Sequence, residues 1–361
     1  MTDEFSEDDL DLEAEQDDAE VTMTYDIASY PSDFTLSGIA KMWEDGDITI
    51  PDYQREFVWS RRQSSLLIDS FLSGLPVPPV FFYIDDENKN LVIDGQQRIL
   101  SVVFFLEGYF GHESTHGKRQ VFRLIGLGDH SPYLGKRYSD LEEADQRRLR
   151  NAVLRAVNIR QLGPTDGNTS AYHIFERLNT GGTPLRSQEI RNVVFRGTFN
   201  DMLKRANADA NWRKIVGNPL LDKHQKDVEL LLRVFSLVGT SAQYEKPLKG
   251  YLNTTMKKHQ DGTSSKAGAF FAAFPEVTKS VVEALGPKPF HLRGPLNVSA
   301  MDSVMSVLIE HHSEIDASKL AERYDALKKD KTFDEHTTYN TTDAKSVLAR
   351  IKVVGEYLLG S

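Results

Sequence analysis

The segment that decides the fold is LVIDGQQRILSVVFFL, residues 91–106. Its first three residues form a short apolar run of the kind found in buried strands. Asp94-Gly95 breaks that run, and we expect a helix from about Gln96 to Leu106. The sequence therefore predicts a strand, a glycine-containing turn and a helix, with the polar motif DGQQR (94–98) at the junction.

Further strands and helices are predicted on both sides of this segment. An apolar run at 80–84 predicts a second strand, which a polar turn joins to the strand at 91–93. A helix is predicted at 61–73, because Ser60 can act as its N-cap and Gly74 can end it. Other elements of this half are expected to be helices at 35–43, 141–152, 170–178 and 187–195 and strands at 48–50, 120–125 and 153–159.

Strand signals fade after about residue 200. Helices are expected from there on, at 199–206, 225–238, 246–258, 267–284, 298–312, 316–327 and 342–358. We therefore predict an α+β protein in which a small mixed domain is followed by an all-helical region. The expected divisions are an acidic tail at 1–25, the mixed domain at 26–198 and the helical domain at 199–361.

The first twenty residues dominate the charge of the chain. They hold eleven of the 53 acidic side chains and no basic one, whereas the other residues hold 43 basic and 42 acidic side chains. A segment of this kind buries too little apolar surface to offset its ordering entropy, so we expect the acidic tail to be disordered. The rest is too evenly charged for a protein that coats DNA, and any contact with nucleic acid must come from local patches.

Composition excludes several classes of protein. The chain has no cysteine, which rules out disulfide frameworks, thiolate metal sites, iron–sulfur clusters and a cysteine nucleophile. The N-terminus lacks the apolar core of a signal peptide, and no run of eighteen apolar residues could cross a membrane. We expect a cytoplasmic protein.

The DGQQR junction has features of an anion-binding site. A glycine turn before a helix points unpaired N–H groups and the positive end of the helix dipole at one place, and Gly95 lets a ligand approach the backbone. Arg98 in the first turn opposes the dipole, and a phosphate bound beside it would explain its presence. The alternative is that Asp94 only caps the helix and Arg98 only pairs with a carboxylate.

A second cluster, IPDYQREFVW at 50–59, alternates apolar and polar residues. Gln54 and Arg55 can donate hydrogen bonds to a phosphate or a base. The aromatic residues of the cluster are more often core residues than stacking platforms; they are Tyr53, Phe57 and Trp59.

A third cluster, FERLNTGGTPL at 175–185, places Glu176 and Asn179 one helical turn apart. Carboxylate and carboxamide oxygens at this spacing suit Mg²⁺, with nucleotide phosphates completing its shell. The alternative is a surface glutamate followed by an asparagine that ends the helix in the left-handed conformation.

Two groups of basic residues are candidates for contact with DNA. A solvated helix face is the commoner explanation of such runs. The candidates are Lys118, Arg119 and Arg123 in one group and Arg147, Arg148 and Arg150 in the other.

Taken in order, four segments resemble the N-terminal domain family of GmrSD-type restriction endonucleases, within the ParB/sulfiredoxin-like superfamily. The resemblance extends over about residues 30 to 358, with weaker matches at 226–237 and around Arg350. The four segments are IPDYQREFVW (50–59), LIDSFLSGLPVPPVFFY (67–83), VIDGQQR (92–98) and FERLNTGGTPLRSQEIRN (175–192).

This resemblance implies a ParB-like domain with an appended helical region, and nucleotide binding and hydrolysis with Mg²⁺. DGQQR would be the phosphate-side motif, with Asp94, Gln97 and Arg98 as catalytic candidates. The expected nucleotide-binding residues are Tyr53, Gln54, Arg55, Gly95, Gln96 and Arg98. By looser analogy, Glu176 and Asn179 would be Mg²⁺ ligands.

Full-length GmrSD-type enzymes carry a second, histidine-dependent nuclease domain whose start resembles I-E-H-x-x-P. Here Ile309-Glu310-His311 is followed by His312-Ser313, and the proline is missing. We therefore expect a stand-alone GmrS-like subunit without its own nuclease domain, which works with a separate histidine-dependent nuclease and with DNA.

The expected function is a Mg²⁺-dependent NTPase subunit of a modified-DNA restriction or anti-phage defence system. The alternative, from another class, is a regulatory module that binds nucleotide or DNA and hydrolyses nothing.

Overall fold

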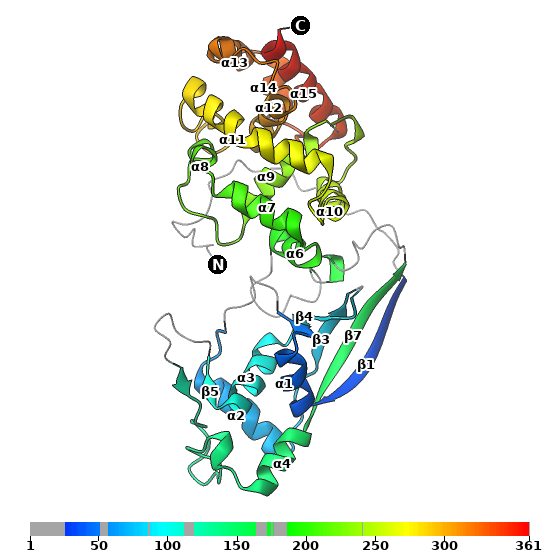
Figure 1. The fold of residues 1–361 in the computed structure, drawn as a ribbon, viewed down its shortest axis with the longest axis vertical. Coiled ribbons are helices and arrows are strands. Elements are labelled where there is room, and N and C mark those ends of the chain that lie inside the picture. Colours follow the sequence, from blue (N-terminus) through cyan, green and yellow to red (C-terminus); the bar gives the residue numbers. More distant parts are fainter. Residues whose placement is uncertain are drawn as a thin grey trace. The chain divides into compact units, whose positions relative to one another are not determined.

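The computed structural model describes residues 26–50, 57–85, 87–111, 119–163, 172–174, 176, 186–239 and 241–360. They fall into two compact units, one within residues 24–184 and the other beginning at Leu185 (Figure 1). The first contains a mixed sheet and helices, and the second is built from helices. The predicted α+β fold class is therefore confirmed. The acidic tail at 1–25 lies outside the described residues.

The division between the units falls at 184/185, whereas the sequence suggested 198/199. The helix α6 (Ser187–Val194) explains the difference, because its side chains bond to the helical unit. Arg191 donates to Asn253 and Glu229, and Phe195, which follows α6, is buried in the core of that unit.

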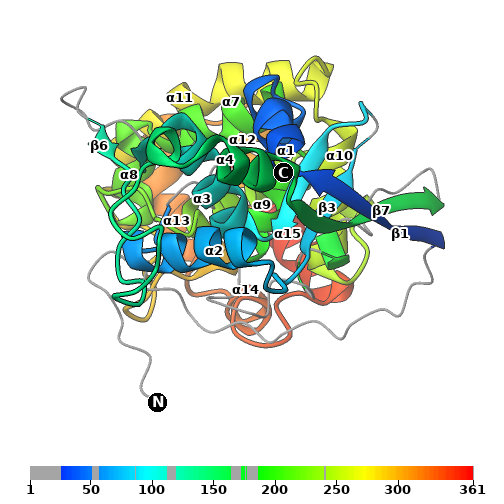
Figure 2. The same ribbon diagram turned by 90° about the horizontal axis from the view of Figure 1, so that it is seen from below.

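The five-stranded sheet of the first unit has the order β1-β7-β3-β4-β2. Its outer pair, β1 with β7, is antiparallel over ten residue pairs and forms a long ribbon in both views (Figures 1 and 2). β7 runs parallel to β3, β3 antiparallel to β4, and β4 parallel to β2. The strands are β1 (Asp26–Thr35), β2 (Ile48–Thr49), β3 (Val80–Ile84), β4 (Asn90–Asp94) and β7 (Val153–Gly163), with β5 (Tyr109–Phe110) and β6 (Gln120–Val121) in a separate pair.

Helices of the first unit lie against one face of this sheet (Figure 1). They are α1 (Leu36–Glu44), α2 (Arg61–Ser73), α3 (Gln96–Glu107) and α4 (Glu143–Asn151), with a short 3-10 helix at Tyr138–Asp140. α3 is the central helix, and its residues from Ile99 to Phe105 are all buried. The bounds of α2 are those predicted, because Ser60 and Gln63 form a capping box and Gly74 ends the helix at φ 71°.

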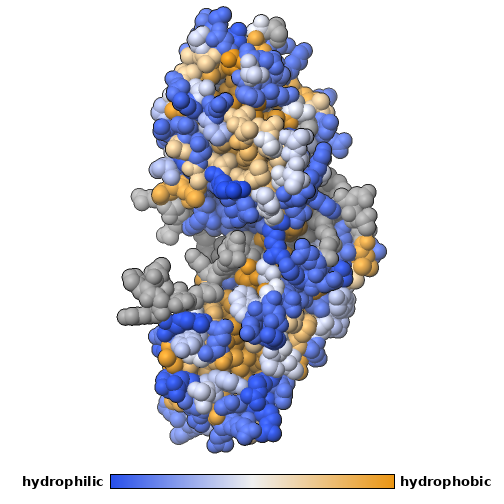
Figure 3. Space-filling model, in the orientation of Figure 1, coloured by the Kyte–Doolittle hydropathy of each residue, from blue (hydrophilic) through white to orange (hydrophobic). Residues whose placement is uncertain are grey.

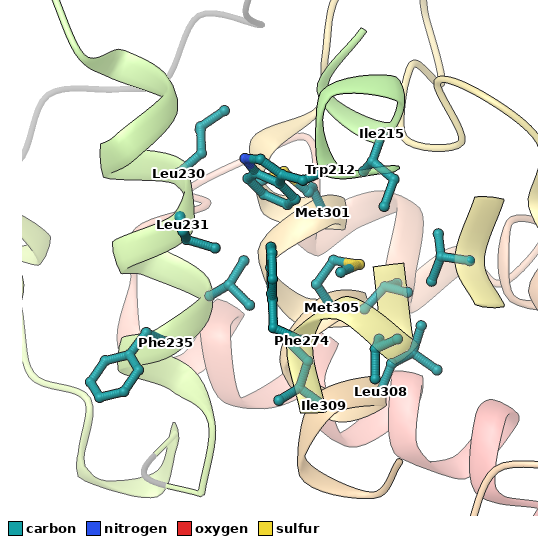
Figure 4. Close-up of a cluster of buried hydrophobic side chains, with 14 of the residues drawn as sticks. Trp212, Ile215, Leu230, Leu231, Phe235, Phe274, Met301, Met305, Leu308 and Ile309 are labelled. Atoms are coloured by element: carbon teal, nitrogen blue, oxygen red, sulfur yellow. The ribbon is translucent and has the colours of Figure 1, made fainter. Parts of the chain in front are cut away.

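The helical unit is organised around α9 and α12. Every residue of α12 from Val298 to Ile309 is buried, as are those of α9 from Leu230 to Leu237. Trp212, Phe274 and Met301 meet between them in the cluster of Figure 4. The elements are α7 (Thr198–Asn207), α8 (Ala210–Val216), α9 (Lys226–Leu237), η4 (Ser241–Gln243), α10 (Leu248–Lys258), α11 (Ser265–Leu285), α12 (Val298–Glu310), η5 (Ala317–Lys319), α13 (Leu320–Leu327), α14 (Lys331–His336) and α15 (Ala344–Leu359).

Hydrophilic side chains are spread over both units on the face shown in Figure 3. Among the described residues, no helix combines the length and the apolar character needed to cross a membrane.

Candidate functional site

The predicted strand–turn–helix junction is present. β4 ends at Asp94, Gly95 is the N-cap in the left-handed region (φ 99°), and α3 begins at Gln96. No side chain caps α3, so the alternative that Asp94 acts as its cap is wrong. The helix therefore begins with N–H groups that no side-chain cap occupies.

Packing of β3 explains the glycine at this junction. A Cβ placed on Gly95 would lie 2.3 Å from Cγ1 of Val80 and 3.1 Å from its Cα. Any other residue would clash there, in addition to the strain of positive φ. Gly95 thus permits a close approach of the protein's own strand, and the residue is explained without a ligand.

Arg98 pairs with Asp94 across the junction. Its Nη2 donates to Asp94 Oδ2 at 2.6 Å and to the carbonyl oxygen of Pro79 at 3.1 Å. The side chain of Arg98 is 17% exposed, whereas that of Asp94 is 49% exposed. The buried Nε of Arg98 has no hydrogen-bond partner among the described residues. The guanidinium is therefore fixed in place, with a solvent-accessible carboxylate in front of it.

Gln97 ties a second motif segment to the junction. Its Oε1 accepts hydrogen bonds from the backbone N–H groups of Val58 at 3.1 Å and Trp59 at 3.2 Å. Phe57, just before them, packs edge-on against Phe104 of α3, with ring centroids 5.0 Å apart. Gln97 thereby holds the end of the IPDYQREFVW segment at the start of α3. Tyr53, Gln54 and Arg55, which precede this anchor in the chain, lie outside the described residues.

Gln96 points away from solvent, unlike Gln97. It is 8% exposed, and its buried Nε2 has no hydrogen-bond partner among the described residues. Buried amide groups are normally satisfied, so Gln96 and Arg98 both bring a spare donor to the first turn of α3.

The predicted magnesium ligands are only partly described. Glu176 lies in a helical stretch, and its Oε2 is 3.6 Å from Nδ1 of His173. Asn179 lies outside the described residues. Within the described part of the chain, no three acidic or histidine side chains are grouped as a metal site. The Mg²⁺ role of Glu176 and Asn179 therefore stays a prediction.

The basic residues considered for DNA contact have partners within the protein. Arg119, Arg123 and two of the arginines on α4 pair with carboxylates, whereas Arg150 donates a hydrogen bond to the hydroxyl group of Tyr138. The pairs are Arg119–Glu107, Arg123–Asp140, Arg147–Glu143, Arg148–Asp145 and Arg150–Tyr138. Lys118 lies outside the described residues. These contacts agree with the interpretation as solvated surface.

The histidines after α12 end that helix. His311 is the C-cap, and its Nδ1 lies 3.3 Å from Oε1 of Glu314. Nδ1 of His312 lies 3.1 Å from the carbonyl oxygen of Ile309. Both rings are thus engaged by neighbours in the same turn region.

Comparison with known families places the junction in a recognised domain. Residues 36–196 match the family model described as GmrSD restriction endonuclease, N-terminal domain. This stretch of the chain is similar to that family. The match begins at α1, ends just after α6 and contains the DGQQR junction together with the anchor at Val58 and Trp59. The predicted resemblance is therefore confirmed over this range. No curated protein and no solved structure matches the chain.

The sequence analysis missed two residues that contribute to the DGQQR junction. Pro79 supplies a carbonyl to Arg98, and Val80 forces the glycine at position 95. Both belong to the LPVPPVFFY stretch, which was recognised as a matching segment without any assigned role.

Proposed function

We propose that this chain is the nucleotide-binding component of a restriction or anti-phage defence system and hydrolyses a nucleoside triphosphate with Mg²⁺. The family of residues 36–196 supports a role in such a system. The observation that carries the nucleotide proposal is the pair of hydrogen bonds to Gln97. They bring the chain that follows Tyr53-Gln54-Arg55 to the start of a helix that no side chain caps, where phosphate groups bind well.

The residues at the junction would have different roles in nucleotide binding and hydrolysis. Backbone N–H groups in the first turn of α3 would donate to phosphate oxygens. Arg98 would neutralise developing charge, since phosphoryl transfer depends mainly on positioning and electrostatic stabilisation. Its Nη2 now bonds to Asp94, so a phosphate would take the place of that carboxylate.

Asp94, released from Arg98, would orient the attacking water or bind the metal. Asp94, Glu176 and Asn179 would hold Mg²⁺, because their side chains carry oxygen atoms of the kind it prefers, and the bound ion would supply positive charge to the phosphates. Gln97 would be a positioning residue, because its side-chain oxygen is already committed to Val58 and Trp59.

The partners follow from the same family. We propose DNA as the target, and a separate histidine-dependent nuclease as the subunit that cuts it, so that this chain is not a nuclease by itself. The five arginines considered for DNA contact all have partners within the protein, which favours recognition of DNA through the assembled system rather than through these residues alone.

The alternative is a regulatory module that binds nucleotide or DNA without hydrolysis. The closed Asp94–Arg98 pair favours it, because a purely structural pair would look the same. Calorimetric titration of the full chain with each NTP, with and without Mg²⁺, tests the binding claim. Arg147→Ala, which removes an exposed arginine far from the junction in sequence, is the matched control. Absence of binding by every NTP would contradict the proposal, whereas binding without phosphate release would select the alternative.

A further inference from the structure

Two adjacent leucines are exposed in the loop between α8 and α9. Leu220 and Leu221 are 59% and 57% exposed, whereas most large apolar side chains of the helical unit are buried. Single apolar residues are common on protein surfaces, but a group of them marks a place where another segment or molecule binds. The exposure of both leucines therefore needs an explanation.

Hydrogen bonds fix the backbone of this loop. The N–H group of Leu220 donates to Oδ1 of Asn218 at 2.9 Å, and its carbonyl oxygen accepts from Arg213. The N–H group of Asp222 donates to Oδ2 of Asp227 at 3.0 Å, and the same oxygen pairs with Arg213. The two leucines are thus exposed on a preformed loop, so a ligand that contacts them has little ordering entropy to offset.

Three exposed lysines lie on the same part of the helical unit. Lys214 is in the last turn of α8, and Lys223 follows the leucines in their loop. Lys288 lies beside them, since its N–H group donates to the carbonyl oxygen of Lys214 at 3.0 Å. A Cβ on Gly217 would lie 2.9 Å from Cε of Lys288, so the glycine leaves room for this side chain at the end of α8. None of the three lysines forms an ion pair with another described residue.

The carboxylates of this region do not offset the lysines at the surface. Asp222 and Asp227, the acidic residues closest in sequence to the leucines, are buried and accept hydrogen bonds from backbone N–H groups and from Arg213. Solvent therefore meets apolar side chains together with positive charge. We call this region the leucine–lysine surface, and it consists of Lys214, Leu220, Leu221, Lys223 and Lys288. It suits a segment that carries large apolar side chains among carboxylates.

The acidic tail of the same chain has this composition. Residues 1–20 hold eleven acidic side chains and no basic one, and their large apolar residues after Met1 are Phe5, Leu10 and Leu12. Residues 13–25 connect Leu12 to the start of β1 and can span up to about 45 Å when extended. Such a tether keeps the acidic tail at a high effective concentration around its own chain.

We propose that the acidic tail binds to the leucine–lysine surface of its own chain. Leu10 and Leu12 contact the leucines of the loop, and the carboxylates beside them pair with the three lysines. Exposed ion pairs are weak and are screened by salt, so the apolar contact supplies most of the affinity and the charges select the segment. The surface is separate from the DGQQR junction, so its test does not depend on nucleotide binding.

Zero-length carbodiimide cross-linking of the full chain tests this contact, because the reagent joins a carboxylate to an amine only where the two groups meet. Mass spectrometry of the monomeric product should find residues 3–15 linked to Lys214, Lys223 or Lys288. Lys331 and Lys345 are internal controls and should carry far fewer links. Both are exposed on the helical unit and form no ion pair with another described residue.

Two double variants remove the apolar contact from either side. Leu10→Ser with Leu12→Ser changes the tail alone, so it tests the proposal even if Leu220→Ser with Leu221→Ser does not fold. Each double variant should lower the yield of links at the three lysines by roughly tenfold or more. Leu162→Ser, which changes an exposed leucine of β7, should leave the yield unchanged.

Three results would overturn the proposal. They are links spread evenly over all exposed lysines, links found only between two chains, and a yield in the tail variant equal to that of wild type.

Discussion

Arg98 and Asp94 form an ion pair that spans the turn between β4 and α3, with Nη2 and Oδ2 2.6 Å apart. A cation in the first turn of a helix opposes the helix dipole. Asp94 compensates for that charge in the free protein, and the carbonyl of Pro79 anchors the same nitrogen to the segment before β3. Arg98 therefore makes stabilising contacts in the free protein, and a phosphate must compete with Asp94 for its guanidinium group.

Replacing Gly95 by alanine should destabilise the first unit strongly. The new Cβ would meet Val80 at 2.3 Å and would sit at φ 99°, so we expect a loss of about 2–5 kcal/mol. Gly108→Ala is the matched control at the other end of α3, because its φ is 87° but nothing lies within 4 Å, and it should cost about 1–2 kcal/mol. Urea unfolding measures the free energy of unfolding of both variants. Equal losses would show that Val80 can move away from the new Cβ without a cost in free energy.

Two substitutions of Gln97 distinguish its hydrogen bonds to Val58 and Trp59 from the effect of charge at this position on nucleotide binding. Gln97→Met removes the acceptor for Val58 and Trp59, so stability should fall by about 1–2 kcal/mol and nucleotide affinity by roughly tenfold. Gln97→Glu retains the acceptor oxygen and should keep wild-type stability, while its negative charge still weakens nucleotide binding. Unfolding midpoints and calorimetry check both variants. A Gln97→Met protein with unchanged stability and affinity would refute the anchoring role.

Elements with local signals could be predicted from the sequence, and β1 shows why others could not. The bounds of α2 follow from Ser60, Gln63 and Gly74, which all lie within or beside the helix. β1 has no apolar alternation and contains Pro31, which an edge strand tolerates. Its partner is β7, which lies more than a hundred residues later in the chain. No local sequence pattern therefore indicates that residues 26–35 form a strand.

Two short helices and the partners of several side chains could not be predicted from the sequence, for related reasons. α8 and α14 have seven and six residues, too few to show a helical period, and neither was predicted. The position of DGQQR between strand and helix was correct. The partners of its side chains, Pro79 and the backbone of Val58 and Trp59, come from other segments and depend on the packing of β3 and α2 beside α3.

The buried pair of Arg213 and Asp227 should be essential to the helical unit. Their side chains are 8% and 1% exposed, and Nη1 lies 2.7 Å from Oδ2. Asp227→Asn leaves a buried guanidinium uncompensated, and the expected loss is about 3–5 kcal/mol. Glu143→Gln breaks the exposed pair with Arg147 and should change stability by less than about 0.5 kcal/mol. Similar unfolding midpoints for the two variants would contradict this difference.

Lys266 should make the free energy of unfolding depend on pH in the alkaline range. Burial and the nearby charge of Lys258 lower the pKa of Lys266 to about 8, and its ammonium lies over the ring of Phe235. The unfolded chain, with a pKa near 10.5, binds more protons between these two values, so the free energy of unfolding should rise with pH there. Urea midpoints from about pH 8 to pH 10 should rise more for wild type than for Lys266→Met. Parallel curves would show that Lys266 titrates normally.

The central claim is that the DGQQR junction binds and hydrolyses a nucleoside triphosphate. Arg98→Ala loses its bonds to Asp94 and Pro79, so it should be less stable by about 1–2 kcal/mol but still folded. Loss of a charge-assisted phosphate contact should weaken nucleotide binding by roughly ten- to a hundredfold, and turnover should fall further if the contact tightens in the transition state.

Phosphate release by the full chain, measured with each NTP in Mg²⁺ and in EDTA, tests this claim most directly. We predict Mg²⁺-dependent release with at least one NTP by wild type and by Arg147→Ala, and none by Arg98→Ala at a temperature where circular dichroism shows it folded. Equal release by wild type and Arg98→Ala, or none by wild type with any NTP, would contradict the assignment of this junction as a catalytic phosphate site.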